Sequence, residues 1–226
     1  VSNAKAQLQK AGSKGVIITG LPNVAAQKAV LSYNANSEVM DATKPRLTAM
    51  GNSAEVQRVM SAVAAGVVKG LITVGVDPVY SFPDNDSFVE GYKNLEMSMA
   101  FAMKLDATAS LAQLVAATPH YLESWGDLQM KKGSFSLIQP TIRPLFNTRQ
   151  FQDCLLKWTA NPKNYYDYIK ETWASVLGGT SWNQALHDGV LLSDASVETD
   201  TTASPTDQIS ETLESNSANG ALSSAL

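Results

Sequence analysis

The chain has 226 residues, 44% of them hydrophobic, and a formal net charge of −4 at pH 7, so it can bury a core and has no basic block that would favour a nucleic-acid partner. Its single cysteine, Cys154, excludes an internal disulfide framework and an iron–sulfur cluster ligated by this chain alone. His120 and His187 share no metal-binding spacing, and the longest apolar run falls well short of the roughly 20 residues of a membrane helix, so we expect neither a metal site nor a membrane span.

The first part of the chain is predicted to contain two helices and a strand. Asn3 caps a short helix through residue 11, and the β-branched apolar run at 15–19 predicts a strand covered on both faces. Gly20 opens a turn, and Asn23 caps a helix that spans 24–33. A glycine between a strand and a helix can cradle a phosphate, but no Gly-x-Gly-x-x-Gly or Gly-Lys-Ser/Thr motif is present, which favours an ordinary turn.

Residues 37–42 are predicted as a short strand, and Ser53 is predicted to cap a helix that Gly66 ends. Apolar residues along this helix recur at the spacing of one buried stripe: Val56, Val59, Met60 and Val63.

Strands are next predicted at 70–74 and 95–102, with a helix at 84–93 between them. Such alternation is typical of βαβ units with a parallel sheet. We therefore predict an α/β fold, a Rossmann-like parallel sheet with helices on both faces, in which the strand at 15–19 lies beside these two.

Residues 106–113 are predicted as a short helix and 114–117 as a short strand. The pattern changes after Pro119, where aromatic and apolar residues punctuated by glycines and prolines indicate an irregular packed loop. Trp125 in this loop is expected to be largely buried against the sheet or the helices that follow.

Two helices are predicted near the end of the ordered chain, at 151–158 and 165–176. Five aromatic residues lie in or between them: Trp158, Tyr165, Tyr166, Tyr168 and Trp173. Packing against the sheet and the preceding loop is favoured over a surface that receives another domain.

We divide the chain into a Rossmann-like domain at 1–150, an aromatic-rich helical extension packed on it at 151–192, and a polar linker at 193–226 with one short helix at 205–215. The chain lacks an initiator Met and begins within a predicted helix, so it is expected to be a piece of a longer multidomain subunit.

Several segments carry a resemblance to a known superfamily. They are Gly75-Val76-Asp77-Pro78, the run that begins at Thr108, the block at 120–127 and the block at 139–149. Over residues 15–190 the chain resembles the molybdopterin oxidoreductases, and more narrowly the molybdopterin-oxidoreductase-like half of the iron–sulfur subunit of alternative complex III, the quinol-oxidising respiratory complex of Bacteroidetes. This resemblance implies a Rossmann-like domain within a much longer chain.

The departures from the superfamily pattern concern its cofactor loop. Active members contact the pterin through a Gly-x-Asn-Pro loop, and Asp77 stands at the asparagine position between Gly75 and Pro78. A carboxylate there repels the cofactor's phosphates and removes a hydrogen-bond donor. The Thr-x-x-x-Ala-Asp run is also altered after Thr108. The resemblance therefore implies a degenerate pterin loop at these residues, with no catalytic residue and no bound cofactor in this part.

Charged residues outside that loop could serve either acid/base chemistry or structural hydrogen bonding. His120, Glu123 and Asp127 could form an acid/base group, because histidine titrates near neutrality, but structural hydrogen bonding is favoured. Arg143 and Arg149 are likewise interpreted as ion-pair or interdomain residues.

Two functions are compatible with the resemblance. The favoured one is a non-catalytic scaffold domain of an electron-transfer subunit on the periplasmic side of the membrane, with iron–sulfur clusters elsewhere in the parent chain and other domains and subunits as partners. The alternative is a cofactor-binding domain of an active molybdopterin-dependent oxidoreductase.

Overall fold

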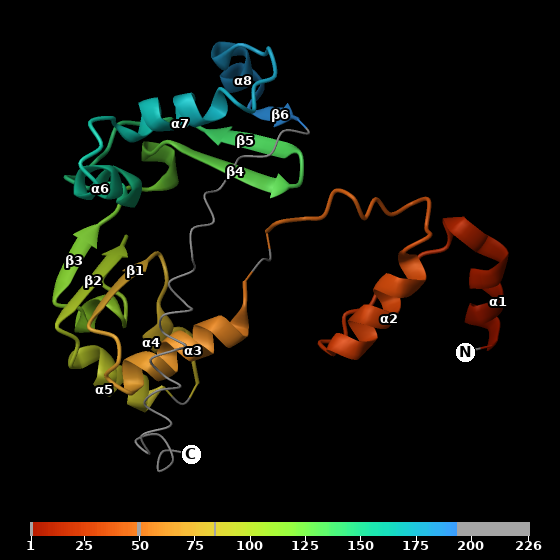
Figure 1. The fold of residues 1–226 in the computed structure, drawn as a ribbon, viewed down its shortest axis with the longest axis horizontal. Coiled ribbons are helices and arrows are strands. Elements are labelled where there is room, and N and C mark those ends of the chain that lie inside the picture. Colours follow the sequence, from red (N-terminus) through yellow and green to blue (C-terminus); the bar gives the residue numbers. More distant parts are fainter. Residues whose placement is uncertain (1, 49–50, 84, 194–226) are drawn as a thin grey trace.

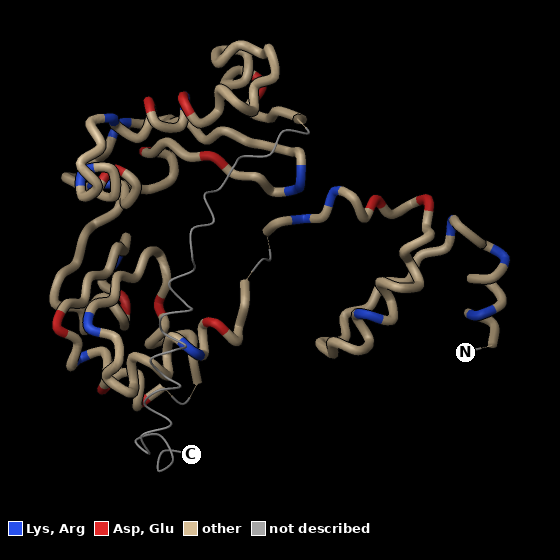
Figure 2. The backbone as a smooth tube through the Cα atoms, viewed as in Figure 1, with Lys and Arg blue, Asp and Glu red and all other residues tan. Residues whose placement is uncertain are grey.

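The computed structural model describes residues 2–48, 51–83 and 85–193. Figure 1 shows three parts: a helical N-terminal arm, defined here as residues 2–48, a parallel sheet with its helices, and an antiparallel sheet with its helices. Lys, Arg, Asp and Glu are dispersed over all three parts rather than gathered into one block (Figure 2). Among the described helices none is long and apolar enough to cross a membrane.

The parallel sheet contains β1 (Gly70–Val74), β2 (Met97–Ala102) and β3 (Leu114–Ala117) in that order. Thr73 lies opposite Ala100, and Ala100 opposite Val115. The connections contain α4 (Pro78–Ser81), α5 (Asp86–Lys93) and the 3-10 helix η2 (Ala109–Leu111). The predicted α/β class, a parallel sheet flanked by helices, is therefore confirmed.

Two helices, α3 (Ser53–Ala64) and α5, pack together beside this sheet. Their buried core residues are Met60, Val63, Phe88, Tyr92 and Leu95. A Cβ atom added to Gly91 of α5 would lie 2.3 Å from the backbone oxygen of Val63, so the two helices touch through their backbones. Elsewhere, Phe101 of β2 packs edge-on against Phe151 and Trp158 of α6 (Phe151–Trp158), at ring-centroid distances of 4.9 and 6.1 Å.

The antiparallel sheet consists of β4 (Gly126–Lys131), β5 (Ser134–Ile138) and β6 (Val190–Leu192), with a register shift between Gln129 and Lys131. Helices α7 (Tyr165–Trp173) and α8 (Trp182–Asp188) complete its core. The buried residues of this core are Phe135, Ile169, Trp173, Val176, Trp182 and Ala185.

The structure corrects the predicted loop after Pro119. That stretch forms the β4–β5 hairpin, with a turn at Gly133, whose φ is +77°. The sequence did not predict β4 because its side chains are largely exposed, so polar and apolar residues do not alternate along it as they do in a half-buried strand. Trp125, expected to be largely buried, is half-buried against Tyr166 of α7, with ring centroids 4.6 Å apart.

In the arm, α1 (Ser2–Ala11) and α2 (Val24–Asn34) confirm the predicted helices, and the Asn23 side chain accepts from the backbone N–H of Ala26 as an N-cap. The strands predicted at 15–19 and 37–42 are wrong, since neither segment pairs with another strand. An apolar β-branched run becomes a strand only where a partner edge is available.

Smaller corrections concern helix ends. Asn52, not Ser53, caps α3, accepting from the N–H groups of Ala54 and Glu55. The helix predicted at 84–93 begins at Asp86, and the one predicted at 106–113 is reduced to the turn of η2. The linker predicted at 193–226, with its helix at 205–215, lies outside the described residues except for Ser193.

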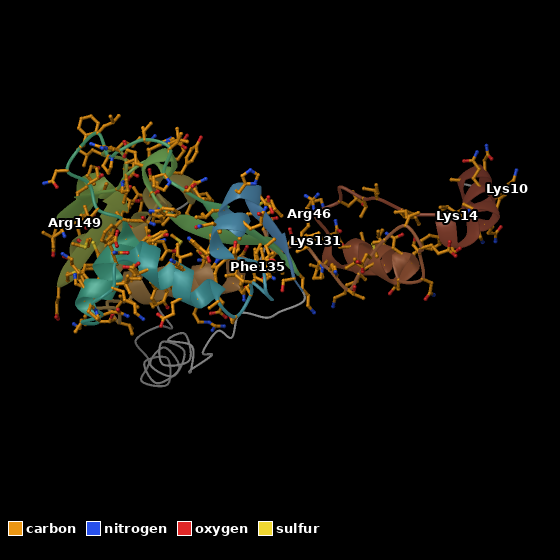
Figure 3. All side chains as sticks on the ribbon, turned by 90° about the horizontal axis from the view of Figure 1, so that it is seen from above. Lys10, Lys14, Arg46, Lys131, Phe135 and Arg149 are labelled. Carbon is orange, nitrogen blue, oxygen red and sulfur yellow. The ribbon has the colours of Figure 1, made fainter. Side chains whose placement is uncertain are left out.

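The arm joins the body at the hairpin. Leu47 donates its N–H to Met130 O at 2.9 Å, and Lys132 donates to Pro45 O at 3.0 Å. The bridge between them sets Arg46 opposite Lys131, and Figure 3 shows these two residues together where the arm begins. Like charges directly opposite each other are unfavourable in a strand pair, so this attachment depends on the two backbone hydrogen bonds.

Candidate functional site

The candidate site lies at the carboxyl edge of the parallel sheet. Because β1, β2 and β3 run parallel, the loops that leave them gather at one edge, which is where open α/β sheets bind ligands. The loop after β1, residues 75–78, is the predicted degenerate pterin loop. We call it the β1 loop.

Glycine is required at the start of the β1 loop. Gly75 has φ +62°, a left-handed conformation, and its N–H donates to Phe101 O at 2.9 Å, continuing the β1–β2 ladder. The chain then turns so that Asp77 caps α4 by accepting from Tyr80 N–H at 3.3 Å, with Pro78 at the start of the helix. An Asp–Pro pair is a favourable helix start, because proline there has no N–H left unpaired.

The Asp77 carboxylate also binds the segment that follows β2. Its Oδ1 accepts from the Thr108 hydroxyl at 2.6 Å and from Thr108 N–H at 3.0 Å, while Oδ2 accepts from Ala107 N–H at 3.2 Å. Thr108 is fully buried, and its Oγ1 in turn accepts from Val79 N–H at 3.1 Å. Asp77 and Thr108 therefore join two loops into one hydrogen-bonded unit, which we call the Asp77–Thr108 lock.

This environment fixes the charge of Asp77. Partial burial by itself raises the pKa of the carboxyl, but hydrogen bonds from the Thr108 hydroxyl and from the N–H groups of Thr108, Ala107 and Tyr80 outweigh it and lower the pKa below its usual value. Asp77 is thus ionised at neutral pH, and four donors from its own chain occupy its oxygens. It is therefore not a proton donor at neutral pH, and three of these donors bind Oδ1 while one binds Oδ2.

One residue at this edge, Asp77, is unfavourable for a pterin cofactor. The side chain at the position of the contacting amide is an anion turned onto its own backbone, so it offers no donor and adds repulsion toward phosphates. In the described ranges, no group of three or more His, Cys, Asp or Glu side chains could hold a metal ion.

His120 and Glu123 meet at the end of β3, but through backbone atoms. His120 Nδ1 accepts from Leu122 N–H at 3.3 Å, and Glu123 Oε2 accepts from His120 N–H at 3.1 Å, which makes a capping box around η3 (Tyr121–Glu123). Glu123 Oε1 accepts from Leu145 N–H at 3.2 Å. The pair holds the 120–145 loop closed and leaves the imidazole without a carboxylate partner among the described residues.

Asp127, the third member of the suggested acid/base group, belongs to the other core. Its Oδ2 accepts from Trp173 Nε1 at 2.9 Å. Burial, followed by the negative charge of Asp127, raises the pKa of the nearby Tyr165 to about 12. Asp127 therefore ties β4 to α7 and does not join His120.

Neither Arg143 nor Arg149 forms an ion pair within the described part of the chain. Arg149 donates its backbone N–H to Ala117 O at 3.2 Å, beside β3, and its side chain lines a 360 Å³ cavity with Glu123 and Lys157. The ion-pair interpretation of these arginines is not what the structure shows. A larger cavity of 560 Å³, bordered by α3 and α5, lies near the amino end of β1 and so away from the β1 loop.

The position of the β1 loop could be predicted from the sequence, but the role of Asp77 there could not. The Asp–Pro pair was a readable signal for a helix cap. No signal connected Asp77 to Thr108, because the two are separated by 31 positions and meet only once the parallel sheet has formed.

No protein-family model and no curated protein matches the chain. Among solved structures, the chain is similar to acetylene hydratase from Pelobacter acetylenicus, with a TM-score of 0.52 and 16% sequence identity. The similarity covers 60% of this chain and 20% of the hydratase chain. At this identity the likeness shows the fold alone. It agrees with the α/β class of the fold, and the resemblance to the molybdopterin oxidoreductases and to alternative complex III stays a proposal.

Proposed function

We propose that the chain is a non-catalytic scaffold domain of an electron-transfer subunit in a membrane quinol-oxidising respiratory complex. The observation that carries the non-catalytic part is the Asp77–Thr108 lock. Where a cofactor-binding loop keeps a donor free for its ligand, this loop uses its polar side chain for four bonds to its own chain. A loop closed in this way holds the ends of β1 and β2 together and leaves the Asp77 side chain without a donor for a pterin.

A docking role is supported by the apolar residues around the same edge. Six large residues in α4 and the loops of this region are more than half exposed: Val76, Tyr80, Met103, Leu105, Leu145 and Phe146. Clustered exposure of this kind marks surfaces that other domains or proteins cover. In the proposed function they pack against other domains of the same subunit and against neighbouring subunits.

The remaining parts of the proposal come from the resemblance. Iron–sulfur clusters belong to other regions of the parent chain, which agrees with a single, half-buried cysteine here. The domain is placed on the periplasmic side of the membrane.

A second candidate is a cofactor-binding domain of an active molybdopterin-dependent oxidoreductase. The fold likeness to acetylene hydratase favours it, as does the left-handed Gly75, which brings bare backbone to the carboxyl edge of the sheet. The charge and bonding of Asp77 weigh against it.

Metal and pterin analysis of the full-length parent protein separates the two candidates. The scaffold function predicts no molybdenum, no tungsten and no extractable pterin, alongside iron in the complex. Stoichiometric molybdenum or tungsten with pterin would instead establish the second candidate.

A further inference from the structure

A cavity of ligand size lies beside the carboxyl end of β3, and the β1 loop does not line it. Its volume is 360 Å³, near the lower end of the roughly 300 to 1,000 Å³ of small-molecule sites, so it suits a small metabolite. Its lining includes Pro119, just after β3, and Arg149, whose backbone N–H donates to Ala117 O at the last residue of that strand. The cavity therefore lies at the edge of the sheet where open α/β folds bind ligands.

Two cations on this cavity have no ionic partner in the described ranges. Arg149 and Lys157 both line the cavity, and the side chain of neither forms an ion pair or a hydrogen bond there. Lys163, the third cation on the lining, pairs with Glu171 instead. A guanidinium presents a planar fork of donors that matches a carboxylate, and an ammonium adds a compact charge. Arg149 and Lys157 are therefore suited to hold one oxyanion.

The same cavity also presents a hydrogen-bond acceptor. Both oxygens of Glu123, which lines it, already accept from backbone N–H groups, those of His120 and Leu145. Asp153, also on the lining, uses only Oδ1, which accepts from Tyr165 N–H at 3.0 Å. Asp153 Oδ2 has no hydrogen-bond partner in the part of the chain that the structure describes. This oxygen is available to a donor on a ligand.

The acceptor and the cations are arranged in depth. Asp153 and Lys157 are four positions apart on α6, so their side chains lie on the same face of the helix, yet they do not form an ion pair. Asp153 is half-buried, whereas Arg149 and Lys157 are exposed. The acceptor therefore lies deeper than the two cations, which border the mouth of the cavity.

A buried hydroxyl adds a further polar group to the lining. The Oγ1 atom of Thr148 is buried and makes no hydrogen bond to the described residues. Buried polar groups in proteins almost always have a partner, so an isolated one beside a cavity marks a place where a polar ligand atom or a water binds.

We propose that this cavity binds a small carboxylic acid that also carries a hydrogen-bond donor, namely an α-amino or an α-hydroxy acid. The carboxylate of the ligand binds Arg149 and Lys157 at the mouth, and its ammonium or hydroxyl group donates to Asp153 Oδ2. The two carboxylates on the lining disfavour a phosphate, because they repel a dianion more than a monoanion. The site does not use the β1 loop, so it is independent of the scaffold function proposed above.

Titration of the full chain with four probes tests the ligand class. L-lactate, L-alanine, acetate and inorganic phosphate are added at constant ionic strength, and NMR gives each dissociation constant. Lactate or alanine is expected to bind about tenfold more tightly than acetate, which lacks the donor to Asp153. The tighter of the two identifies a hydroxy acid or an amino acid as the ligand. The proposal is overturned if neither binds, or if acetate or phosphate binds as tightly.

Matched variants test the two cations. Arg149→Gln and Lys157→Gln should each weaken binding of the tighter probe about tenfold, because each removes a charge-assisted bond. Arg143→Gln and Lys170→Gln remove the same charges from exposed residues outside the lining and should leave the dissociation constant unchanged. Equal effects in all four variants would reduce the binding to a general effect of net charge and overturn the site.

Asp153→Asn tests the inner end of the cavity. The variant keeps an oxygen that can accept from Tyr165 N–H but loses the negative charge, so alanine should bind more weakly relative to lactate than it does to the wild type. Unchanged binding of both probes would remove Asp153 from the site and overturn the proposal.

Chemical protection of the wild-type chain avoids any dependence on variants that fold poorly. Phenylglyoxal modifies exposed arginines, and mass spectrometry after digestion measures its reaction at Arg149 and Arg143 separately. A saturating concentration of the tighter probe should slow modification of Arg149 and leave that of Arg143 unchanged. Equal rates at Arg149 with and without the probe would place the ligand elsewhere.

Discussion

The hydroxyl of Thr108 donates to the Asp77 carboxylate at 2.6 Å and accepts from the N–H of Val79 at 3.1 Å. One buried side chain thus bonds to Asp77 in the β1 loop and to Val79 in the helix that follows it. A buried polar group that loses its partner destabilises the folded state by more than one hydrogen bond stabilises it. Removing the Thr108 hydroxyl should therefore destabilise the β1 loop strongly.

Thr108→Val keeps the shape of the side chain and removes both hydrogen bonds. We expect the free energy of unfolding to fall by about 1 to 3 kcal/mol, the cost of unpairing partners that include a charged group. Chemical denaturation measures the change, with Thr118→Val as the control, because the Thr118 hydroxyl makes no hydrogen bond to the described residues. Equal losses in the two variants would contradict the lock.

Acid should weaken the lock through Asp77. Its folded pKa lies below the usual 3.8, so the stability it contributes is present above that pH and is lost as the pH falls through the folded pKa. Asp77→Asn cannot ionise, and its amide directs a donor at the N–H of Ala107 or Thr108. The variant should be less stable at neutral pH, and its deficit relative to wild type should shrink in acid. Denaturation curves across that pH range measure both; a constant deficit refutes the assignment.

Asp77→Asn should not restore a cofactor to the parent protein. It returns the superfamily's residue to the loop, but one hydrogen bond contributes only about 1 to 3 kcal/mol, and cofactor capture in the superfamily draws on several domains. Elemental analysis and pterin fluorescence of the purified variant should match the wild type. Recovery of metal with pterin in the variant alone would show that Asp77 was the single obstacle.

Replacing the two tryptophans of the second core by alanine should lower the free energy of unfolding by different amounts. Trp173 is 2% exposed and donates to Asp127, so Trp173→Ala should destabilise by about 3 to 5 kcal/mol. Trp125 is half-buried and rests on Tyr166, so Trp125→Ala should cost less than that. Thermal and chemical unfolding of the pair measures the difference, and a larger loss at Trp125 would contradict this ranking.

Local pattern predicted the parallel sheet well. Residues 70–74 and 114–117 form strands at the predicted bounds, because each is a short apolar run between turn-forming residues. The run at 15–19 has the same composition and failed, since composition reports the capacity to pair and not the presence of a partner. The β4–β5 hairpin was not predicted, because the exposed side chains of β4 do not alternate between polar and apolar.

The position of the candidate site was predicted, but the hydrogen bonds that Asp77 makes there were not. The glycine turn after β1 placed the loop correctly, and the expectation that the charge of Asp77 disfavours a pterin stays a prediction. The positive role of that charge, as acceptor for Thr108 and Ala107, depends on how two connections meet at the sheet edge. Sequence spacing does not encode such a meeting.

The contact of Gly91 with the backbone of Val63 limits what mutation can do to the first core. Even the smallest side chain at position 91 would collide with main-chain atoms that have no rotamer through which to yield. A library randomised at this codon and selected for folded protein should return glycine almost alone, while neighbouring exposed positions such as Glu90 accept many residues. The distance between α3 and α5 is therefore fixed by this backbone contact. Substitutions in this core are tolerated only where they leave that distance unchanged.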